Sequence, residues 1–276
     1  MPRRKSTVVG RELGEAVRNA IGPTKLNQRR LAKELDWDEA KLSDLVRGKG
    51  GVNEAELMLL LGYCRVDPPE VRRLIALFHE TRDNCYLQIP EDGIPDQVRT
   101  LIEQEQLANA ITVWSALLVP GLLQTVDYMR ALVAEWPPNE SVDYEDVIKA
   151  RIERRRLLHW DRTFVFYIHE FALRLPVGGP SVMKDQLIHL LGVAERSYVT
   201  VKVVPTAIGP HAGASGSFLQ LRYEKFDPVI FIESKTSCLF IEDPTSLATY
   251  ARVLKRLDAQ ALDAEDSKEL IRSIQF

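Results

Sequence analysis

Apolar residues recur at helical spacing in the first part of the chain. Leu13, Val17 and Ile21 lie four positions apart, and Gly22-Pro23 follows them as a helix stop. Four further short helices are expected. Two lie within residues 26–49, one begins at residue 53 and one begins at residue 68. Asn53 has the position and chemistry of an N-cap. The pattern predicts a mainly α N-terminal bundle of five helices.

The remainder of the chain mixes helical and strand patterns. Helices are expected over residues 96–118, 125–135, 144–158, 181–191, 244–262 and 265–274. Strands are expected where β-branched and aromatic residues gather, at residues 163–169, 199–204, 217–223, 229–233 and 238–241. Because short turns join the strands from residue 199 onward, we expect a mostly antiparallel sheet. The second part is therefore predicted to be an α+β domain.

The predicted boundary between the two parts is a linker over residues 83–95, which holds two prolines and a glycine. The predicted domains are then residues 1–82 and 96–276. The first domain has 16 Lys and Arg against 12 Asp and Glu, and the rest of the chain has 20 against 27. A mildly basic unit joined to an acidic body suits a protein that presents one end to a polyanion.

Apolar runs and cysteines limit the environment in which the chain is expected to work. The longest apolar run, around residues 110–123, is too short to span a bilayer. Cys64, Cys85 and Cys238 are widely spaced and odd in number, which fits a reducing compartment and argues against a disulfide framework or a zinc site. We expect a cytoplasmic protein with no membrane partner, cofactor or metal.

Residues 26–49 (LNQRRLAKELDWDEAKLSDLVRGK) have the pattern of a helix-turn-helix. Small Ala32 allows the two helices to cross closely. Apolar residues that hold the pair together are Leu31, Leu35, Leu42 and Leu45. Gln28 begins the first helix, where its side chain and the helix dipole both favour a phosphate. Double-stranded DNA is therefore the leading candidate partner.

This spacing resembles the Xre/lambda-repressor class of helix-turn-helix regulators over about residues 10–80. The resemblance implies a homodimer whose second motif helix enters the major groove of an operator. It places three side chains against base edges: Glu39, Ala40 and Asp44. It places four against the DNA backbone: Gln28, Lys41, Ser43 and Lys49. Asp38 and Arg47, which flank the helix, complete the expected DNA-binding set.

The acids of this helix set the chain apart from the usual pattern. Relatives commonly carry Ser, Gln or Arg where this chain has Asp38, Glu39 and Asp44. A Glu can accept a hydrogen bond from cytosine, but each acid offsets part of the attraction to phosphate. Basic residues 3–5 could compensate by following the DNA backbone, or they could form a solvated terminus. The alternative reading is a protein-interaction scaffold with little DNA affinity.

A second resemblance rests on residues 119–125 (VPGLLQT) followed by Tyr128, and on Gln186-Leu187 further along. Together with the motif above, these residues resemble actinobacterial antitoxin-like regulators that carry a C-terminal domain of unknown function. The resemblance covers about residues 10–275. It implies a transcriptional regulator whose C-terminal domain dimerises and receives a signal from a ligand or from a small protein encoded next to it.

Candidate ligand-binding groups lie at two places in the second domain. The first is a basic cluster on one helix turn, formed by Arg151, Arg154 and Arg155, although a solvated face with ion pairs would give the same pattern. The second is the glycine-rich segment 209–217 with His211 and Ser215, although this could be a plain connection between strands. No histidine pair has metal-ligand spacing and no cysteine has the context of a nucleophile, so we do not expect an enzyme.

Overall fold

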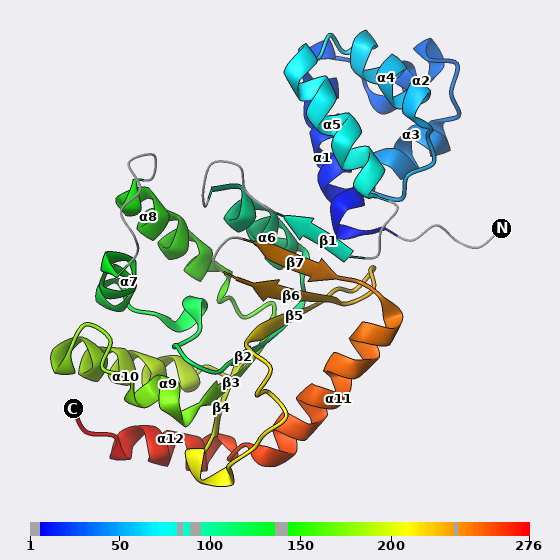
Figure 1. The fold of residues 1–276 in the computed structure, drawn as a ribbon. Helices are drawn as coiled ribbons and strands as arrows, with labels where there is room; N and C mark the ends of the chain where they lie inside the picture. Colours follow the sequence, from blue (N-terminus) through cyan, green and yellow to red (C-terminus); the bar gives the residue numbers. More distant parts are fainter. Residues whose placement is uncertain (1–5, 82–84, 89–94, 136–142, 235–236) are drawn as a thin grey trace. The chain divides into compact units, whose positions relative to one another are not determined.

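The computed structural model describes residues 6–81, 85–88, 95–135, 143–234 and 237–276 (Figure 1). Two compact units divide the chain, Met1–Tyr86 and Leu87–Phe276. Helices alone form the first unit up to residue 81, and the second contains a sheet with helices around it. An α bundle followed by an α+β unit is the predicted fold class, which is thus confirmed.

The N-terminal unit contains the five predicted helices. They are α1 (Val8–Ile21), α2 (Gln28–Glu34), α3 (Glu39–Val46), α4 (Glu54–Tyr63) and α5 (Pro68–Glu80), with a 3-10 turn η1 (Gly22–Thr24) after α1. The predicted N-cap of α4 is confirmed. The Asn53 side chain accepts from the Glu56 backbone N–H, and the Glu56 carboxylate accepts in return from the Asn53 N–H, which forms a capping box.

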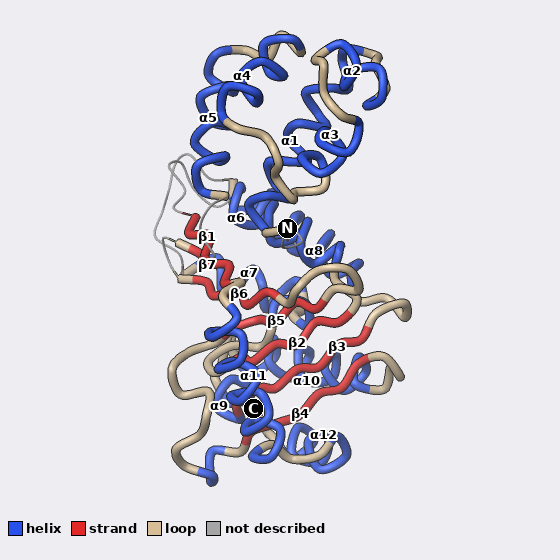
Figure 2. The backbone as a smooth tube through the Cα atoms, turned by 90° about the vertical axis from the view of Figure 1, so that its right-hand side faces the viewer, coloured by secondary structure: helices blue, strands red, loops and turns tan. Residues whose placement is uncertain are grey.

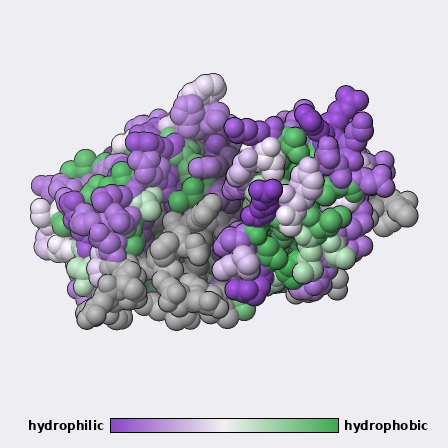
Figure 3. All heavy atoms as spheres, turned by 90° about the horizontal axis from the view of Figure 1, so that it is seen from above, coloured by the Kyte–Doolittle hydropathy of each residue, from purple (hydrophilic) through white to green (hydrophobic). Residues whose placement is uncertain are grey.

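Helix α4 is apolar on more than its inner side. Leu57, Leu60 and Leu61 are fully buried in the bundle. Three other large apolar side chains of the same helix stay exposed: Met58 by 51%, Leu59 by 54% and Tyr63 by 42%. Viewed from above, the surface of the molecule is mostly polar, with apolar side chains reaching it in patches (Figure 3).

The second unit alternates helices with strands. Its helices are α6 (Pro95–Leu107), α7 (Val126–Ala134), α8 (Tyr144–Arg154), α9 (Glu170–Arg174), α10 (Pro180–Ala194), α11 (Pro244–Gln260) and α12 (Ala264–Ser273). Its 3-10 turns are η2 (Gly121–Leu123), η3 (Arg155–Leu157) and η4 (Thr206–Ile208). Within the described residues, no helix is long and apolar enough to cross a membrane.

The sheet has the strand order β1-β7-β6-β5-β2-β3-β4 (Figure 2). Its strands are β1 (Cys85–Gln88), β2 (Ala110–Ser115), β3 (Thr163–His169), β4 (Val199–Val204), β5 (Phe218–Arg222), β6 (Val229–Glu233) and β7 (Cys238–Ile241). Strand β3 pairs in parallel with both β2 and β4. The pairs β2–β5, β5–β6 and β6–β7 are antiparallel, so the sheet is mixed.

Helices cover both faces of this sheet. Helices α10 and α11 lie on opposite faces (Figures 1 and 2). Trp114 of β2, Tyr167 of β3 and Leu257 of α11 belong to one buried cluster. Because side chains alternate along a strand, Phe164 and Phe166 point to the other face, where they are fully buried. Each face therefore has its own apolar core.

The helix predicted over residues 96–118 is wrong in its second half. Helix α6 ends at Leu107, and β2 follows at the middle of the sheet. Ala108 and Ile111 are both buried and are spaced as on a helix face, which suggested one continuous helix. However, the sequence AITVWS favours a strand, because β-branched and aromatic side chains pack well on a pleated surface.

The predicted pairing of successive strands from residue 199 onward is also wrong at its first step. Strand β4 lies at one edge beside β3, whereas β5 lies between β2 and β6. The connection over residues 205–217 is long and includes η4, so it can carry the chain past two strands. Only the pairs β5–β6 and β6–β7 have the short turns that make antiparallel neighbours.

The segment predicted as a linker, residues 83–95, contains an element of the sheet. Strand β1 is hydrogen-bonded to β7 as its neighbour at the sheet edge. The Gln88 side chain donates to the Thr100 hydroxyl and accepts from the Cys238 thiol. Two prolines and a glycine nearby concealed a strand of only four residues, because such a short run has no readable period.

Candidate functional site

The turn between α2 and α3 is closed by hydrogen bonds of the backbone. The Asn27 side chain accepts from the Arg30 N–H at 2.9 Å and caps the start of α2. After the end of α2, the Trp37 N–H donates to the Ala32 carbonyl at 2.8 Å. Asp36 lies between them with a φ of 55°, a left-handed conformation that Asp tolerates better than most residues. Helices α2 and α3 thus form a helix-turn-helix.

Apolar residues of the two helices pack as their spacing predicts. The five predicted positions, Leu31, Ala32, Leu35, Leu42 and Leu45, are all buried. Asp38 is the N-cap residue of α3, but its side chain makes no capping hydrogen bond. Its carboxylate therefore remains available at the start of the helix, where the helix dipole favours an anion.

The predicted DNA-binding residues divide into an exposed set and a half-buried set. Exposed to solvent are Asp38, Glu39, Ala40 and Arg47. Half-buried are Gln28, Lys41, Ser43, Asp44 and Lys49. The exposed set includes the first two residues of α3. Basic residues 3–5, the expected arm, lie outside the described residues.

Ion pairs within the bundle engage several of these side chains. The Lys41 ammonium pairs with the Glu56 carboxylate and lies 5.0 Å from the centre of the Trp37 ring. Lys49 pairs with Asp44 at 3.4 Å, and Arg29 approaches Glu39 at 3.8 Å. Any contact of Lys41 or Lys49 with DNA must therefore compete with an intramolecular pair.

We expect Lys41→Met to raise the pKa of Glu56 toward its ordinary value. The hydrogen bond from Lys41 is the largest cause that lowers this pKa, followed by the bond from the Asn53 N–H. A carboxyl whose pKa falls on folding stabilises the folded protein at pH values above the pKa it has in the unfolded chain. This stabilisation is lost as the pH falls through the pKa it has in the folded protein. The stability difference between wild type and variant should therefore be present at pH 7 and shrink in acid.

Carboxyl NMR titration together with urea unfolding at several pH values would measure both effects. The matched control is Lys49→Met, which removes a cation paired with Asp44 instead. That control should leave the pKa of Glu56 unchanged. A Lys41→Met protein with the wild-type pKa at Glu56 would contradict the assignment of this pair.

Exposed cations on α2 were not singled out from the sequence. Arg29, Arg30 and Lys33 are all exposed, and the Arg29 side chain is 86% so. The available signal was the set of basic residues at 29, 30 and 33, which fall outside the apolar positions 31, 32 and 35. Basic side chains on the first motif helix offset the acids at the start of α3, so the exposed face of the motif has mixed charge.

The three arginines predicted as one basic cluster have three separate environments in the second unit. Arg154 forms two hydrogen bonds of 2.6 Å with the Glu105 carboxylate, whose side chain is fully buried. Arg151 donates to the Gln124 side chain at 3.4 Å, and burial lowers its pKa. Arg155 lies 3.2 Å from the His189 ring nitrogen Nε2. Of the three, Arg155 lines a pocket together with His189 and Arg196.

The glycine-rich segment 209–217 packs against the aromatic core of the sheet. The His211 ring lies 5.1 Å from the Trp114 ring and 5.0 Å from the His169 ring, and it accepts from the Gly213 N–H. The Trp114 indole donates to the Gly213 carbonyl at 2.9 Å. A Cβ on Gly213 would lie 2.3 Å from this indole, so only glycine fits. His211 therefore has a packing role here, whereas Ser215 is exposed.

His169 lies at the start of α9, a helix the sequence patterns did not suggest. Its ring nitrogen Nδ1 accepts from the Phe171 N–H and caps the helix. Burial and then the neighbouring His211 lower the pKa of His169, and Glu170 opposes this shift. Among the described residues, no group of three or more His, Cys, Asp and Glu side chains is placed to hold a metal ion.

The conspicuous VPGLLQT segment is held by side-chain amides. Gln124 donates to the Val119 carbonyl at 2.7 Å. Gln186 of α10 donates to the Leu123 carbonyl at 2.8 Å and accepts from the Thr125 N–H at 2.7 Å. These amides satisfy backbone groups of a buried turn that no helix or strand could satisfy. The segment and Gln186 thus support the architecture of the unit, and nothing in their geometry indicates chemistry.

Comparisons with known proteins identify this second unit. No curated protein matches the chain. A solved structure titled "Structure of TrmBL2, an archaeal chromatin protein, shows a novel mode of DNA binding" is 12% identical, with 91% of this chain and 100% of that chain covered. Its TM-score of 0.31 is too low for a shared fold. The model of the domain of unknown function DUF5753 matches residues 98–273, which is more than half of the chain. The chain therefore belongs to the DUF5753 family.

Proposed function

We propose that this protein is a sequence-specific DNA-binding transcriptional regulator of the Xre, antitoxin-like type that acts in the cytoplasm. The single observation that carries the proposal is the α2–turn–α3 unit. Its second helix exposes Glu39 and Ala40, and Arg47 follows it, over a buried apolar seam. We assign no catalytic reaction to the chain. The C-terminal unit is the receptor for a small partner protein or a ligand.

The charge of the motif fits a reader of base edges with modest affinity for phosphate. Arg29, Arg30 and Lys33 on α2 and Arg47 after α3 are exposed and can contact the DNA backbone. Acids at the start of α3 reduce the general attraction to DNA. A binder of this kind depends more on the correct bases and less on charge, because Glu39 can accept a hydrogen bond from cytosine.

Homodimerisation is part of the proposal. Regulators with this motif bind two half-sites about one DNA turn apart, which requires two copies of the motif. Helix α4 exposes Met58, Leu59 and Tyr63. An apolar strip on a small basic unit is a suitable surface for contact with a second copy.

A gel-shift experiment on the promoter of the protein's own gene tests the proposal. We expect a specific shift at low salt that unrelated competitor DNA does not remove. Gln28→Ala should weaken binding to all sequences, whereas Glu39→Gln should change the preferred base, because an amide both donates and accepts. A wrong base at such a position costs about 1–3 kcal/mol.

The matched control is Arg130→Gln, which removes one exposed cation from the second unit. It should leave the affinity for DNA unchanged. Absence of any specific shift at low salt would contradict the proposal. An unchanged base preference in Glu39→Gln would contradict the assignment of Glu39 to the groove.

A second candidate function is a protein-interaction scaffold with little DNA affinity. The observation that favours it is the set of ion pairs Lys41–Glu56, Lys49–Asp44 and Arg29–Glu39, which neutralise cations that DNA would need. Purification of the full chain from its host would decide between the two. A stoichiometric small protein in the preparation without a specific DNA shift would favour the scaffold.

A further inference from the structure

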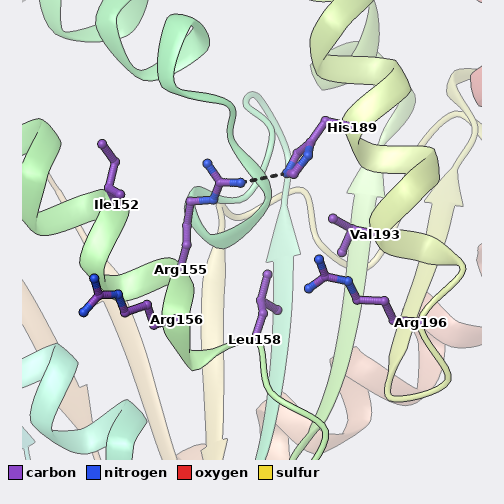
Figure 4. Close-up of a pocket in the computed structure, with 7 residues that line it drawn as sticks. All are labelled: Ile152, Arg155, Arg156, Leu158, His189, Val193 and Arg196. Atoms are coloured by element: carbon purple, nitrogen blue, oxygen red, sulfur yellow. Dashed lines mark hydrogen bonds between the residues drawn. The ribbon is translucent and has the colours of Figure 1, made fainter.

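A pocket of about 250 Å³ opens between the end of α8 and helix α10. We call this cavity the arginine pocket. Its lining residues are Ile152, Arg155, Arg156, Leu158, His189, Val193 and Arg196 (Figure 4). The basic groups come from the helix end at η3, from α10 and from the turn after α10. The segments are packed together, since the Tyr198 hydroxyl donates to the Leu158 carbonyl at 3.3 Å.

Arg155 fixes the state of the histidine in this pocket. Its guanidinium can only donate, so the contact of 3.2 Å from Nη2 makes His189 Nε2 the acceptor (Figure 4). The imidazole is then neutral, with its proton on Nδ1. Burial, and then the charges of Arg155 and Arg196, lower the pKa of His189. A neutral His189 leaves the positive charge of the pocket to the arginines.

Two of these arginines have no balancing charge within the part of the unit that the structure describes. Among the described residues, no carboxylate forms an ion pair with Arg155 or Arg196. Arg196 donates only weakly, to the Tyr198 hydroxyl at 3.4 Å. Arg156 differs, because it pairs with Glu153 at 2.7 Å, is 79% exposed and is directed away from His189 (Figure 4). Arg155 and Arg196 line the same pocket, and the charge of Arg196 acts on Arg155. Two neighbouring cations without an acid create a local potential that favours an anion.

The remaining walls of the pocket are apolar. Ile152, Leu158 and Val193 line it, and Leu158 and Val193 lie nearest the space between Arg155 and Arg196 (Figure 4). A pocket of this size is smaller than the usual site for a drug-sized ligand, so it suits an anionic head group with a few carbon atoms. Guanidinium groups recognise carboxylate and phosphate through paired N–H donors.

We propose that the arginine pocket binds the carboxylate or phosphate group of a small anionic ligand, with Arg155 and Arg196 as its direct partners. The short apolar part of the ligand lies against Leu158 and Val193. This inference rests on one part of the proposed function, that the second unit is a receptor. Binding can be measured without DNA, so its failure and the failure of DNA binding are distinguishable.

Titration calorimetry of the full chain with two probes tests the proposal. The probes are butyl phosphate and pentanoate, which carry the two head groups on a similar short chain. We expect saturable binding of at least one probe at low ionic strength. Arg155→Gln and Arg196→Gln should each weaken it about tenfold or more, the fold-change for losing a charge-assisted hydrogen bond. The stronger of the two probes identifies the head group.

Arg130→Gln is the matched control, because it removes an exposed cation of the same unit outside the pocket. It should change the affinity less than twofold. The proposal is overturned if neither probe binds saturably, or if the control weakens binding as much as Arg155→Gln does. The first outcome would exclude the site, and the second would show a general effect of net charge.

Histidine NMR provides a readout that requires no destabilising variant. The charged groups that act on His189 are Arg155 from η3 and Arg196 beyond α10. An anion between them should raise the pKa of His189 measured in the wild-type protein, whose signal is identified with His189→Gln. A His189 pKa that stays constant at saturating probe would place the bound anion elsewhere and overturn the proposal.

Discussion

Arg154→Met is expected to destabilise the second unit by about 3–5 kcal/mol. The substitution leaves the Glu105 carboxylate fully buried without the guanidinium that donates two hydrogen bonds of 2.6 Å to it. A buried charge without a partner cannot recover the hydration it lost on folding. The methionine side chain fills much of the volume of the arginine stem, so the effect reports the lost pair rather than a cavity.

Urea unfolding of the full chain measures this loss, and hydrogen exchange of the α6 and α8 amides localises it. In the double variant Arg154→Met/Glu105→Leu, most of the stability should return, because neither charge remains buried. The control Arg130→Met breaks only exposed pairs with Asp127 and Glu145 and should cost no more than about 1 kcal/mol. An equally small cost for Arg154→Met would contradict a structural role for the pair.

Prediction from the sequence succeeded where periodicity and boundary residues agreed. In the first unit, Ile21 ends α1 before Gly22-Pro23, and Asn53 caps α4 as its chemistry suggests. In the second unit, the strand predicted over residues 163–169 coincides with β3. These elements are specified by local sequence, because their caps and alternating residues act within a few positions of each other.

Prediction failed where a residue's partner lies far away in the chain. The pair Arg154–Glu105 joins α8 to α6, and nothing in the run of arginines distinguishes Arg154 from Arg155. Strand β2 was taken for a helix because Ala108 and Ile111 are spaced as on a helix face, and its neighbours in the sheet, β3 and β5, come much later in the sequence. A burial pattern seen one segment at a time does not reveal which residues meet across the sheet.

In the candidate sites too, features specified by local sequence could be predicted, and features that need a partner far away in the chain could not. Buried positions of the helix-turn-helix could be predicted from spacing, since an amphipathic helix displays its inner face in its own sequence. The engagement of Lys41 by Glu56 could not, because Glu56 belongs to another helix. Arg196 and His189 were absent from the predicted site for the same reason, although both line the pocket with Arg155.

Gly14→Ala is expected to disrupt the packing of α1 against α3 and to weaken DNA binding through loss of the folded N-terminal unit. A Cβ at this position would lie 2.6 Å from the Val46 carbonyl oxygen and 2.9 Å from the Leu45 carbonyl oxygen. Both neighbours are backbone atoms, so no side-chain rotation can relieve the overlap. Overpacking of this kind costs about 1–3 kcal/mol, and the gain in helix propensity, about 1 kcal/mol, only partly offsets it when the overlap is this close.

The matched control is Gly62→Ala in α4, where an added Cβ would meet nothing within 4 Å. This second variant should stabilise the unit by up to about 1 kcal/mol, because alanine favours the helix and glycine does not. The two identical substitutions are thus expected to move stability in opposite directions, as measured by hydrogen exchange of the α1 and α3 amides. If both variants gained stability, the close approach of α1 to the end of α3 could not hold. That approach supports the helix proposed to read DNA, so Gly14→Ala should lower operator affinity.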